Sequence, residues 1–269
     1  MNHSDSVYLK LLHEIVTYGE TRTDRTGTGT KSLFGGYAHF SLNNMAVPCV
    51  GSKKVLWRKA LLELNWMLRG ETSIYGLGSA QNIWAPWADE DGELGPVYGH
   101  QWRNFNSESI DQIAFIVEEL RARPDSRRAF MSAWNPAQLE DMALPPCPVS
   151  YQFSLRGENF DQLHLHVHQR SADMFLGVPF DLVEYAVLAH LVAATLGVRA
   201  TALHWSYGDA HVYSNHMKQA KAMLRERAPL DNDPVLVLPP QKGYLEGFAE
   251  MSLDGYTYSA GYMPGKIAV

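Results

Sequence analysis

Cys147 is the side chain with the clearest capacity for covalent chemistry. It stands between Pro146 and Pro148, directly before a run of alternating polar and apolar residues over 149–156 that is typical of a strand. Because proline stiffens the backbone, we expect the sulfur to be held at the edge of a rigid element. A thiolate in such a place can act as a nucleophile. Most free cysteines are small buried side chains, and the position alone does not exclude that interpretation.

Arginines supply a second chemical signal. Arg25, Arg127, Arg128 and Arg170 all lie in short polar segments. An arginine lowers the pKa of a nearby thiol and binds a phosphate group through two parallel hydrogen bonds. Each of the four could also be an ordinary solvated surface charge, so their meaning depends on what lies near them in the fold.

Glu63 is a third candidate, because it stands in an apolar stretch between Leu62 and Leu64. A carboxyl group in such surroundings must be hydrogen-bonded or have a raised pKa. The pattern therefore favours a functional carboxyl group.

The elements that must position these side chains are a mixture of helices and strands. Helical periodicity predicts helices over 7–18, 53–69, 109–122 and 182–196, the last apolar nearly all round and so buried. Ser52 is the expected N-cap of the second helix. Strand-like runs cover 32–41, 128–134, 149–156, 162–169, 199–206 and 234–238. Because the two types alternate without a regular rhythm, we predict an α+β fold with a large twisted sheet, in a single domain over 1–269.

Composition excludes several classes of protein. Of 269 residues, 46% are hydrophobic and 19% charged, which excludes a disordered chain. A net charge of -6 gives no basic field for nucleic acid or anionic lipid, and two cysteines predict no disulfide framework. No apolar run approaches the roughly 20 residues that a membrane span needs. The start Met1-Asn-His-Ser-Asp lacks a signal-peptide layout, so we expect a cytoplasmic protein with no membrane or nucleic-acid partner.

Short motifs follow one another along the chain. They are Asp24-Arg25-Thr26-Gly27-Thr28-Gly29-Thr30, Leu94-Gly95-Pro96-Val97-Tyr98-Gly99, Asp125-Ser126-Arg127-Arg128, Pro146-Cys147, Gln169-Arg170-Ser171, Phe175-Leu176-Gly177-Val178-Pro179-Phe180 and His211-Val212-Tyr213-Ser214-Asn215-His216. Together and in this order they resemble the thymidylate synthase family over almost the whole chain.

The resemblance implies the thymidylate synthase fold and a reaction on a pyrimidine nucleotide. Cys147 would add to C6 of the base, which makes C5 a nucleophile toward the one-carbon unit of 5,10-methylenetetrahydrofolate. Glu63 and Tyr98 would organise water and proton transfers beside the base. The implied substrate positions are Arg25, Arg170 and Ser171 for the phosphate, His211 and Tyr213 for the sugar hydroxyl, and Gln169 and Asp181 as further contacts.

The resemblance also implies a folate site and a homodimer formed through the sheets. The folate positions are Ile83, Trp84, Trp87, Leu144, Asp173, Gly177 and Phe180, with the tail Ile267-Ala268-Val269 closing over the ligand. Either tryptophan could otherwise be an ordinary core residue. Arg127 and Arg128 would complete the phosphate site of the other copy.

Asp181 departs from thymidylate synthases, which carry at this place the asparagine that reads the base. An amide both donates and accepts, as uracil requires, whereas a carboxylate accepts from the N4 amino group of cytosine and, once protonated, donates to N3. We therefore predict a cytidine nucleotide as substrate, dCMP before others. The alternative is an ordinary thymidylate synthase that acts on dUMP and tolerates Asp181.

Pro148 is a second departure, because thymidylate synthases carry here a histidine that orders water near O4. Family members with an aspartate at the base-reading position include phage enzymes that modify dCMP, which is consistent with a phage origin. The one-carbon intermediate on the nucleotide takes either hydride, giving methyl, or water, giving hydroxymethyl. Since Trp84 and Trp87 would exclude water, we expect 5-methyl-dCMP and dihydrofolate. A hydroxymethylase is the alternative, because Asp181 or Glu63 could position water.

Two other patterns are given no function. His164, His166 and His168 alternate and so share one strand face, but no Cys, Asp or Glu joins them in the segment, and we predict no metal site. Gly27 and Gly29 lack the lysine of a Walker phosphate loop. The rival from another class is a catalytically silent nucleotide-binding or RNA-binding protein, which the intact catalytic set argues against.

Overall fold

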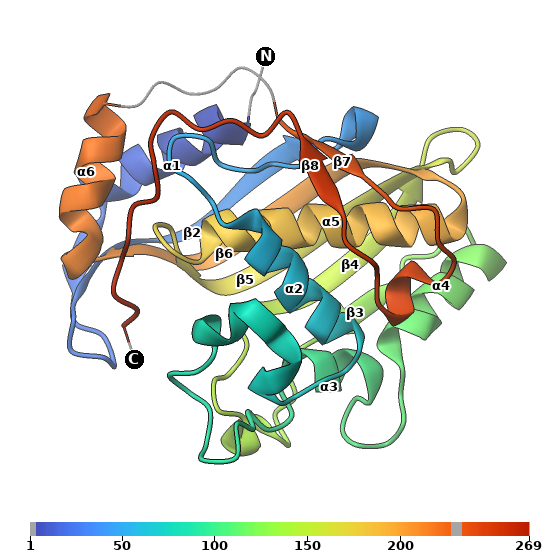
Figure 1. Cartoon of the computed structure of the whole chain (residues 1–269). Coiled ribbons are helices and arrows are strands. Elements are labelled where there is room, and N and C mark those ends of the chain that lie inside the picture. Colours follow the sequence, from blue (N-terminus) through green and yellow to red (C-terminus); the bar gives the residue numbers. More distant parts are fainter. Residues whose placement is uncertain (1–3, 227–232, 269) are drawn as a thin grey trace.

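The computed structural model describes residues 4–226 and 233–268, and these residues confirm the predicted α+β fold (Figure 1). Six strands form one mixed sheet in the order β1-β2-β6-β5-β4-β3. The pair β5 and β6 is parallel, and the other neighbours are antiparallel. The strands are β1 (Glu20–Arg22), β2 (Thr30–Ser41), β3 (Phe130–Ser132), β4 (Pro148–Arg156), β5 (Gln162–Asp173) and β6 (Arg199–Tyr213).

Helix α5 (Val178–Leu196) is the central helix of the core and contacts β5, β6 and α2 (Trp57–Leu68). Figure 1 shows α5 and α2 together over one face of the sheet. Most of α5 is buried, as its all-round apolar composition predicts. Gly197 ends the helix in the left-handed conformation, with φ at 74°.

The expectation that no apolar run approaches the length of a membrane span needs correction at α5. By length and composition alone, its 19 residues could cross a membrane, but 78% of the most apolar window is buried inside the fold. The apolar surface of α5 is therefore taken up by the core.

The other helices are α1 (Ser4–Tyr18), α3 (Tyr98–Arg103), α4 (Gln112–Ala122) and α6 (Met217–Glu226), with 3-10 helices at Asn43–Met45, Ile74–Ile83, Leu139–Asp141, Ser214–His216 and Tyr244–Glu246. The strands β7 (Val235–Val237) and β8 (Ser252–Asp254) pair with each other outside the main sheet. The strand predicted over 234–238 therefore exists but does not extend the six-stranded sheet.

Several predicted helix boundaries are wrong. The helix expected over 53–69 begins only at Trp57, after Leu56 at the N-cap position. Ser52 does not cap it, and the Ser52 Oγ is buried with no hydrogen-bond partner among the described residues. The helix expected over 109–122 begins at Gln112, where the Asp111 side chain accepts from the Ala114 backbone N–H at 2.9 Å. The helix expected over 182–196 begins earlier, at Val178.

Two strands are longer than predicted, and the added residues include several of the predicted site residues. The strands expected over 162–169 and 199–206 continue to Asp173 and Tyr213. They continue because the parallel ladder between β5 and β6 extends to the pair Asp173 and His211. The strand expected over 128–134 is shorter, since only Phe130–Ser132 pairs with β4.

The side chains of β5 alternate between the two faces of the sheet. Leu165 is fully buried, whereas His164 is half-buried and His166 and His168 are exposed on the opposite face. His164 Nδ1 lies 3.1 Å from His204 Nε2 on β6. The prediction that the three histidines share a sheet face is confirmed. Among the described residues, no group of three His, Cys, Asp or Glu side chains is arranged to hold a metal ion.

Candidate active site

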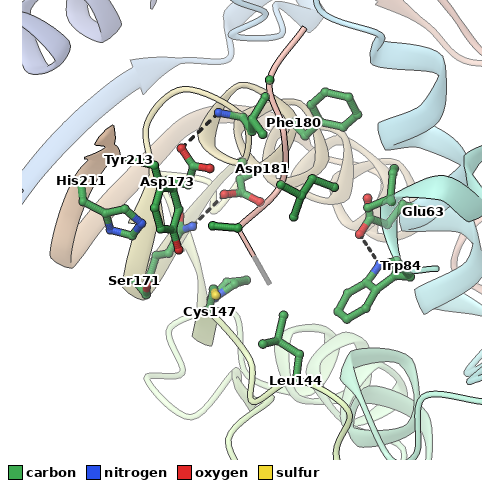
Figure 2. Close-up of a pocket in the computed structure, with 18 of the residues that line it drawn as sticks. Glu63, Trp84, Leu144, Cys147, Ser171, Asp173, Phe180, Asp181, His211 and Tyr213 are labelled. Carbon is green, nitrogen blue, oxygen red and sulfur yellow. Dashed lines mark hydrogen bonds between the residues drawn. The ribbon is translucent and has the colours of Figure 1, made fainter. Parts of the chain in front are cut away.

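A cavity of about 620 Å³ lies where strands β4, β5 and β6 meet helices α2 and α5, and Figure 2 shows part of its lining. Every predicted site residue except Arg127 and Arg128 lines this cavity. These residues are Arg25, Glu63, Ile83, Trp84, Trp87, Tyr98, Leu144, Cys147, Gln169, Arg170, Ser171, Asp173, Gly177, Phe180, Asp181, His211, Tyr213 and Ala268. Segments spread over most of the sequence therefore converge on one cavity.

Cys147 is held by its backbone directly before β4. Its N–H donates to Tyr98 Oη at 2.7 Å, and its carbonyl accepts from the Arg170 N–H at 2.8 Å. Burial raises the pKa of the Cys147 thiol to about 11, while the charge of Arg170 and a hydrogen bond with Ser171 act in the opposite direction. Burial thus favours the thiol over the thiolate at Cys147.

Arg170 supports the segment that leads into Cys147. Its Nε and Nη2 donate to the carbonyls of Pro146 and Pro145, both at 2.8 Å. The guanidinium also lies over the Trp134 ring, 5.4 Å from its centroid. The same charged group thus lines the cavity and fixes the backbone of the cysteine.

Glu63 is a carboxyl group that borders the aromatic side chains of the cavity. It is buried on α2, and its Oε1 accepts from Trp84 Nε1 at 2.7 Å (Figure 2). Burial raises the pKa of Glu63, and the hydrogen bond from Trp84 offsets only part of this effect. The Trp84 ring lies 5.9 Å from both the Trp87 and Tyr98 rings, edge to face.

Asp181 lies in the first turn of α5 and receives a hydrogen bond from Gln169, whose Nε2 is 2.7 Å from Oδ2. The Gln169 Oε1 accepts from Trp205 Nε1 at 2.9 Å and from Tyr185 Oη at 3.1 Å. Because two donors occupy the amide oxygen, the amide nitrogen must point to Asp181. Burial raises the pKa of Asp181 to about 6, and the Gln169 bond partly opposes this.

His211 and Tyr213 project from the extended end of β6. His211 Nδ1 lies 3.1 Å from Asp209 Oδ1, and the His211 and Tyr213 rings meet edge to face with centroids 4.9 Å apart. Burial disfavours the charged imidazole, but Asp209 and Asp173 outweigh it and raise the pKa of His211. Asp173 Oδ1 in turn accepts from the N–H groups of Phe175 and Leu176, at 2.9 and 3.2 Å.

The predicted folate positions form the apolar part of the cavity. Ile83, Leu144 and Phe180 join the two tryptophans there, with the Gly177 backbone and the Asp173 carboxyl group beside them. A flat aromatic ring system with polar edges suits such a lining, so the residues present fit a folate. The tail residues Ile267 and Ala268 line the same cavity, and Val269 lies outside the described residues.

Arg127 and Arg128 do not reach this cavity from their own chain. Both side chains are exposed, and Arg127 lines a separate hollow of about 260 Å³ on the sheet face that carries His164 and His166. Within one chain, therefore, neither arginine lines the cavity.

Among the cavity residues that the sequence analysis did not predict are Lys53, Glu184 and Asp209. Glu184 had a usable signal, because it is a carboxyl group in an apolar helix, three residues after Asp181 and thus on the same face. Asp209 lay beyond the predicted end of its strand, and Lys53 lay in a predicted helix that begins four residues later.

Comparison with known proteins agrees with this geometry. The family described as "Thymidylate synthase" matches residues 6–269. The thymidylate synthase of Brachyspira hyodysenteriae is 40% identical over 256 residues, which cover 93% of this chain and 95% of that protein. The chain therefore belongs to the thymidylate synthase family, folate-dependent enzymes that transfer a one-carbon unit to C5 of a nucleotide.

Proposed function

We propose that this member of the family methylates dCMP at C5, with methylenetetrahydrofolate as co-substrate and dihydrofolate as the second product. The observation that carries the proposal is the carboxyl group of Asp181, held inside the cavity by Gln169 at 2.7 Å. The thymidylate synthase asparagine that Asp181 replaces would present an amide at this point.

The hydrogen bonding of Asp181 supports cytosine over uracil. Gln169 engages Oδ2 as a donor, and an ionised Asp181 has only acceptor capacity left for a base. The N4 amino group of cytosine supplies a donor, whereas O4 of uracil is itself an acceptor and would face the carboxylate unpaired. Leaving buried polar groups unpaired gives discrimination on the order of 10⁴-fold in sites built for hydrogen bonding.

Cys147 is the proposed nucleophile, adding through its sulfur to C6 of the base. Because burial raises its pKa, the thiol would pass its proton to water beside the base as the bond between sulfur and C6 forms, and the charge of Arg170 favours that loss. Glu63 and Tyr98, which both contact Trp84, would organise water and proton transfers beside the base.

The remaining lining divides between phosphate and sugar. Arg25, Arg170 and Ser171 would bind the 5′-phosphate, and His211 with Tyr213 would bind the 3′-hydroxyl. We propose a homodimer in which Arg127 and Arg128 of a second copy complete the phosphate site, since neither side chain lines the cavity of its own chain.

Whether a methyl or a hydroxymethyl group is formed depends on whether water reaches the one-carbon intermediate. When bound, methylenetetrahydrofolate supplies both the one-carbon unit and the hydride that completes a methyl group. Trp84 and Trp87 cover this part of the cavity and would exclude water, which favours methylation. Hydroxymethylation is the alternative if Asp181 or Glu63 holds a water molecule against the intermediate.

The first test is to incubate the protein with methylenetetrahydrofolate and either dCMP or dUMP, following dihydrofolate absorbance and the mass of the nucleotide. We expect dihydrofolate and 5-methyl-dCMP from dCMP, and little turnover of dUMP. Hydroxymethyl-dCMP without a rise in dihydrofolate absorbance would show that the enzyme is a hydroxymethylase, in which water and not hydride reacts with the intermediate. Preferred turnover of dUMP would make it a thymidylate synthase, as the curated relative is named, and would refute the base-reading argument.

A further inference from the structure

Glu184 is a buried carboxyl group beside the proposed catalytic carboxyl group Glu63. Glu184 is 7% exposed on α5 and Glu63 is 8% exposed on α2, and both line the cavity. Helices α2 and α5 pack against each other, and a hydrogen bond between the two carboxyl groups lowers the pKa of Glu63 and raises that of Glu184. Helices α2 and α5 therefore bring together two carboxyl groups that are 121 positions apart.

In the described part of the chain, no salt bridge joins a cation to Glu63 or Glu184. Among the described residues, the charges that shift the pKa of either group come from carboxyl groups, Asp181 acting on both and Glu63 acting on Glu184. Tyr151 on β4 and Tyr185 on α5 feel the charge of Glu184 but carry none themselves at neutral pH. Two carboxylates in contact inside a protein cannot both stay ionised without a counter-ion, so one of them keeps its proton.

The hydrogen bonds decide which group keeps the proton. Glu63 Oε1 accepts from Trp84 Nε1 at 2.7 Å, which stabilises a negative charge on Glu63. Glu184 has no such donor, and its Oε1 is buried without a partner among the described residues. Its position one turn after Asp181 adds a second nearby negative charge.

We propose that Glu184 is a positioning residue that stays protonated and donates a hydrogen bond to Glu63, so that the pair shares one proton and Glu63 alone carries the charge. Burial and the neighbouring carboxyl groups raise the pKa of Glu184 well above its ordinary value, in agreement with this assignment. The consequence for catalysis rests on the proposed function, because it assumes that Glu63 acts on the base. The shared proton itself does not depend on that function.

Ionisation of Glu63 can be followed without substrate through the indole N–H of Trp84, which bonds directly to it. The measurement is a pH titration of the Trp84 indole signal in ¹⁵N–¹H spectra of the full-length protein, assigned by its loss in Trp84→Phe. Glu184→Gln retains a neutral donor and should leave the midpoint within a few tenths of a pH unit. Glu184→Leu keeps the volume without a donor and should raise the midpoint by about one pH unit or more, because a hydrogen bond to a charged group is lost.

Opposite results would overturn the proposal. A lower midpoint in Glu184→Leu would mean that Glu184 carries the charge in the native protein, and an unchanged midpoint would mean that it does not act on Glu63. Equal shifts in the Leu and Gln variants would point to packing alone. Thermal unfolding of both variants checks that each is folded, and the Gln variant alone still tests the prediction if the Leu variant is not. A titration as expected, together with no turnover of dCMP, would refute the proposed substrate and leave the carboxyl pair standing.

Discussion

Gln169 donates a hydrogen bond to Asp181, and its amide cannot turn over without breaking two others. The Nε2 to Oδ2 distance is 2.7 Å, and Trp205 and Tyr185 both donate to the amide oxygen. All four side chains are wholly or partly buried, so water does not easily replace a lost partner. The orientation of the proposed base-reading carboxyl group is therefore set by residues behind it in the core.

Base preference should depend on pH. Burial raises the pKa of Asp181 to about 6, so the carboxyl group is ionised at pH 8 and gains a proton below pH 6. A protonated Asp181 can donate to O4 of uracil, whereas cytosine is accepted by both forms. We expect kcat/KM for dUMP relative to dCMP to rise roughly tenfold or more between pH 8 and pH 5.5.

Asp181→Asn is the matched control for this pH effect, because an amide does not titrate. Its preference should move from dCMP toward dUMP and be independent of pH. Steady-state kinetics with both nucleotides checks the prediction, and a wild-type ratio that stays flat with pH would show that Asp181 does not read the base.

Removing the donor behind Gln169 should weaken discrimination between the bases. In Trp205→Phe the amide oxygen loses one of its two donors, and the amide can turn its oxygen toward Asp181. A hydrogen bond of about 1 kcal/mol corresponds to an approximately fivefold fall in the preference for dCMP. Trp102→Phe is a matched control, because Trp102 is equally buried but its Nε1 has no hydrogen-bond partner among the described residues. Equal losses in both variants would indicate a packing effect.

Alkylation should be slow at Cys147 in the free protein. Because burial raises its pKa to about 11, iodoacetamide should react at pH 8 at least tenfold more slowly than with an unperturbed thiol, and the rate should still be increasing above pH 9. Arg170→Ala removes the charge that lowers the pKa, so labelling should slow further. Mass spectrometry of the Cys147 peptide measures the rate, and Cys49→Ala should not change it, since Cys49 is buried. A plateau below pH 8 would contradict this account.

Mixing two inactive variants tests the proposed dimer. Cys147→Ala lacks the nucleophile, and the double variant Arg127→Ala with Arg128→Ala lacks the arginines offered to the other copy. In a mixed dimer, one site combines an intact Cys147 with intact arginines, so random exchange should restore about a quarter of wild-type activity. Mixing Cys147→Ala with Glu63→Ala is the control. Each change removes a side chain from the cavity of its own chain, so neither site of a mixed dimer is intact and no activity should return. Failure of the first mixture to gain activity would place the arginines' action within their own chain.

Local patterns in the sequence were sufficient for much of the fold. The apolar periodicity over 182–196 and the alternation over 149–156 each lie within one element, and the structure contains a buried helix and a strand there. The ends of the strands could not be predicted from such local patterns. β6 continues to Tyr213 because the neighbouring strands β2 and β5 pair with it beyond the alternating stretch, and pairing partners are not visible in a local pattern.

The sequence supplies the residue types that line the cavity, and the order of its motifs was sufficient to identify the segments that form it. What the tertiary structure decided is how those groups act on one another. Gln169 with Trp205, and Glu63 with Glu184, are pairs 36 and 121 positions apart, and only the packing of β5 on β6 and of α2 on α5 brings them into contact. Burial then fixes the amide orientation and moves the carboxyl pKa values, because desolvation and hydrogen-bond partners depend on the folded surroundings and not on neighbours in sequence.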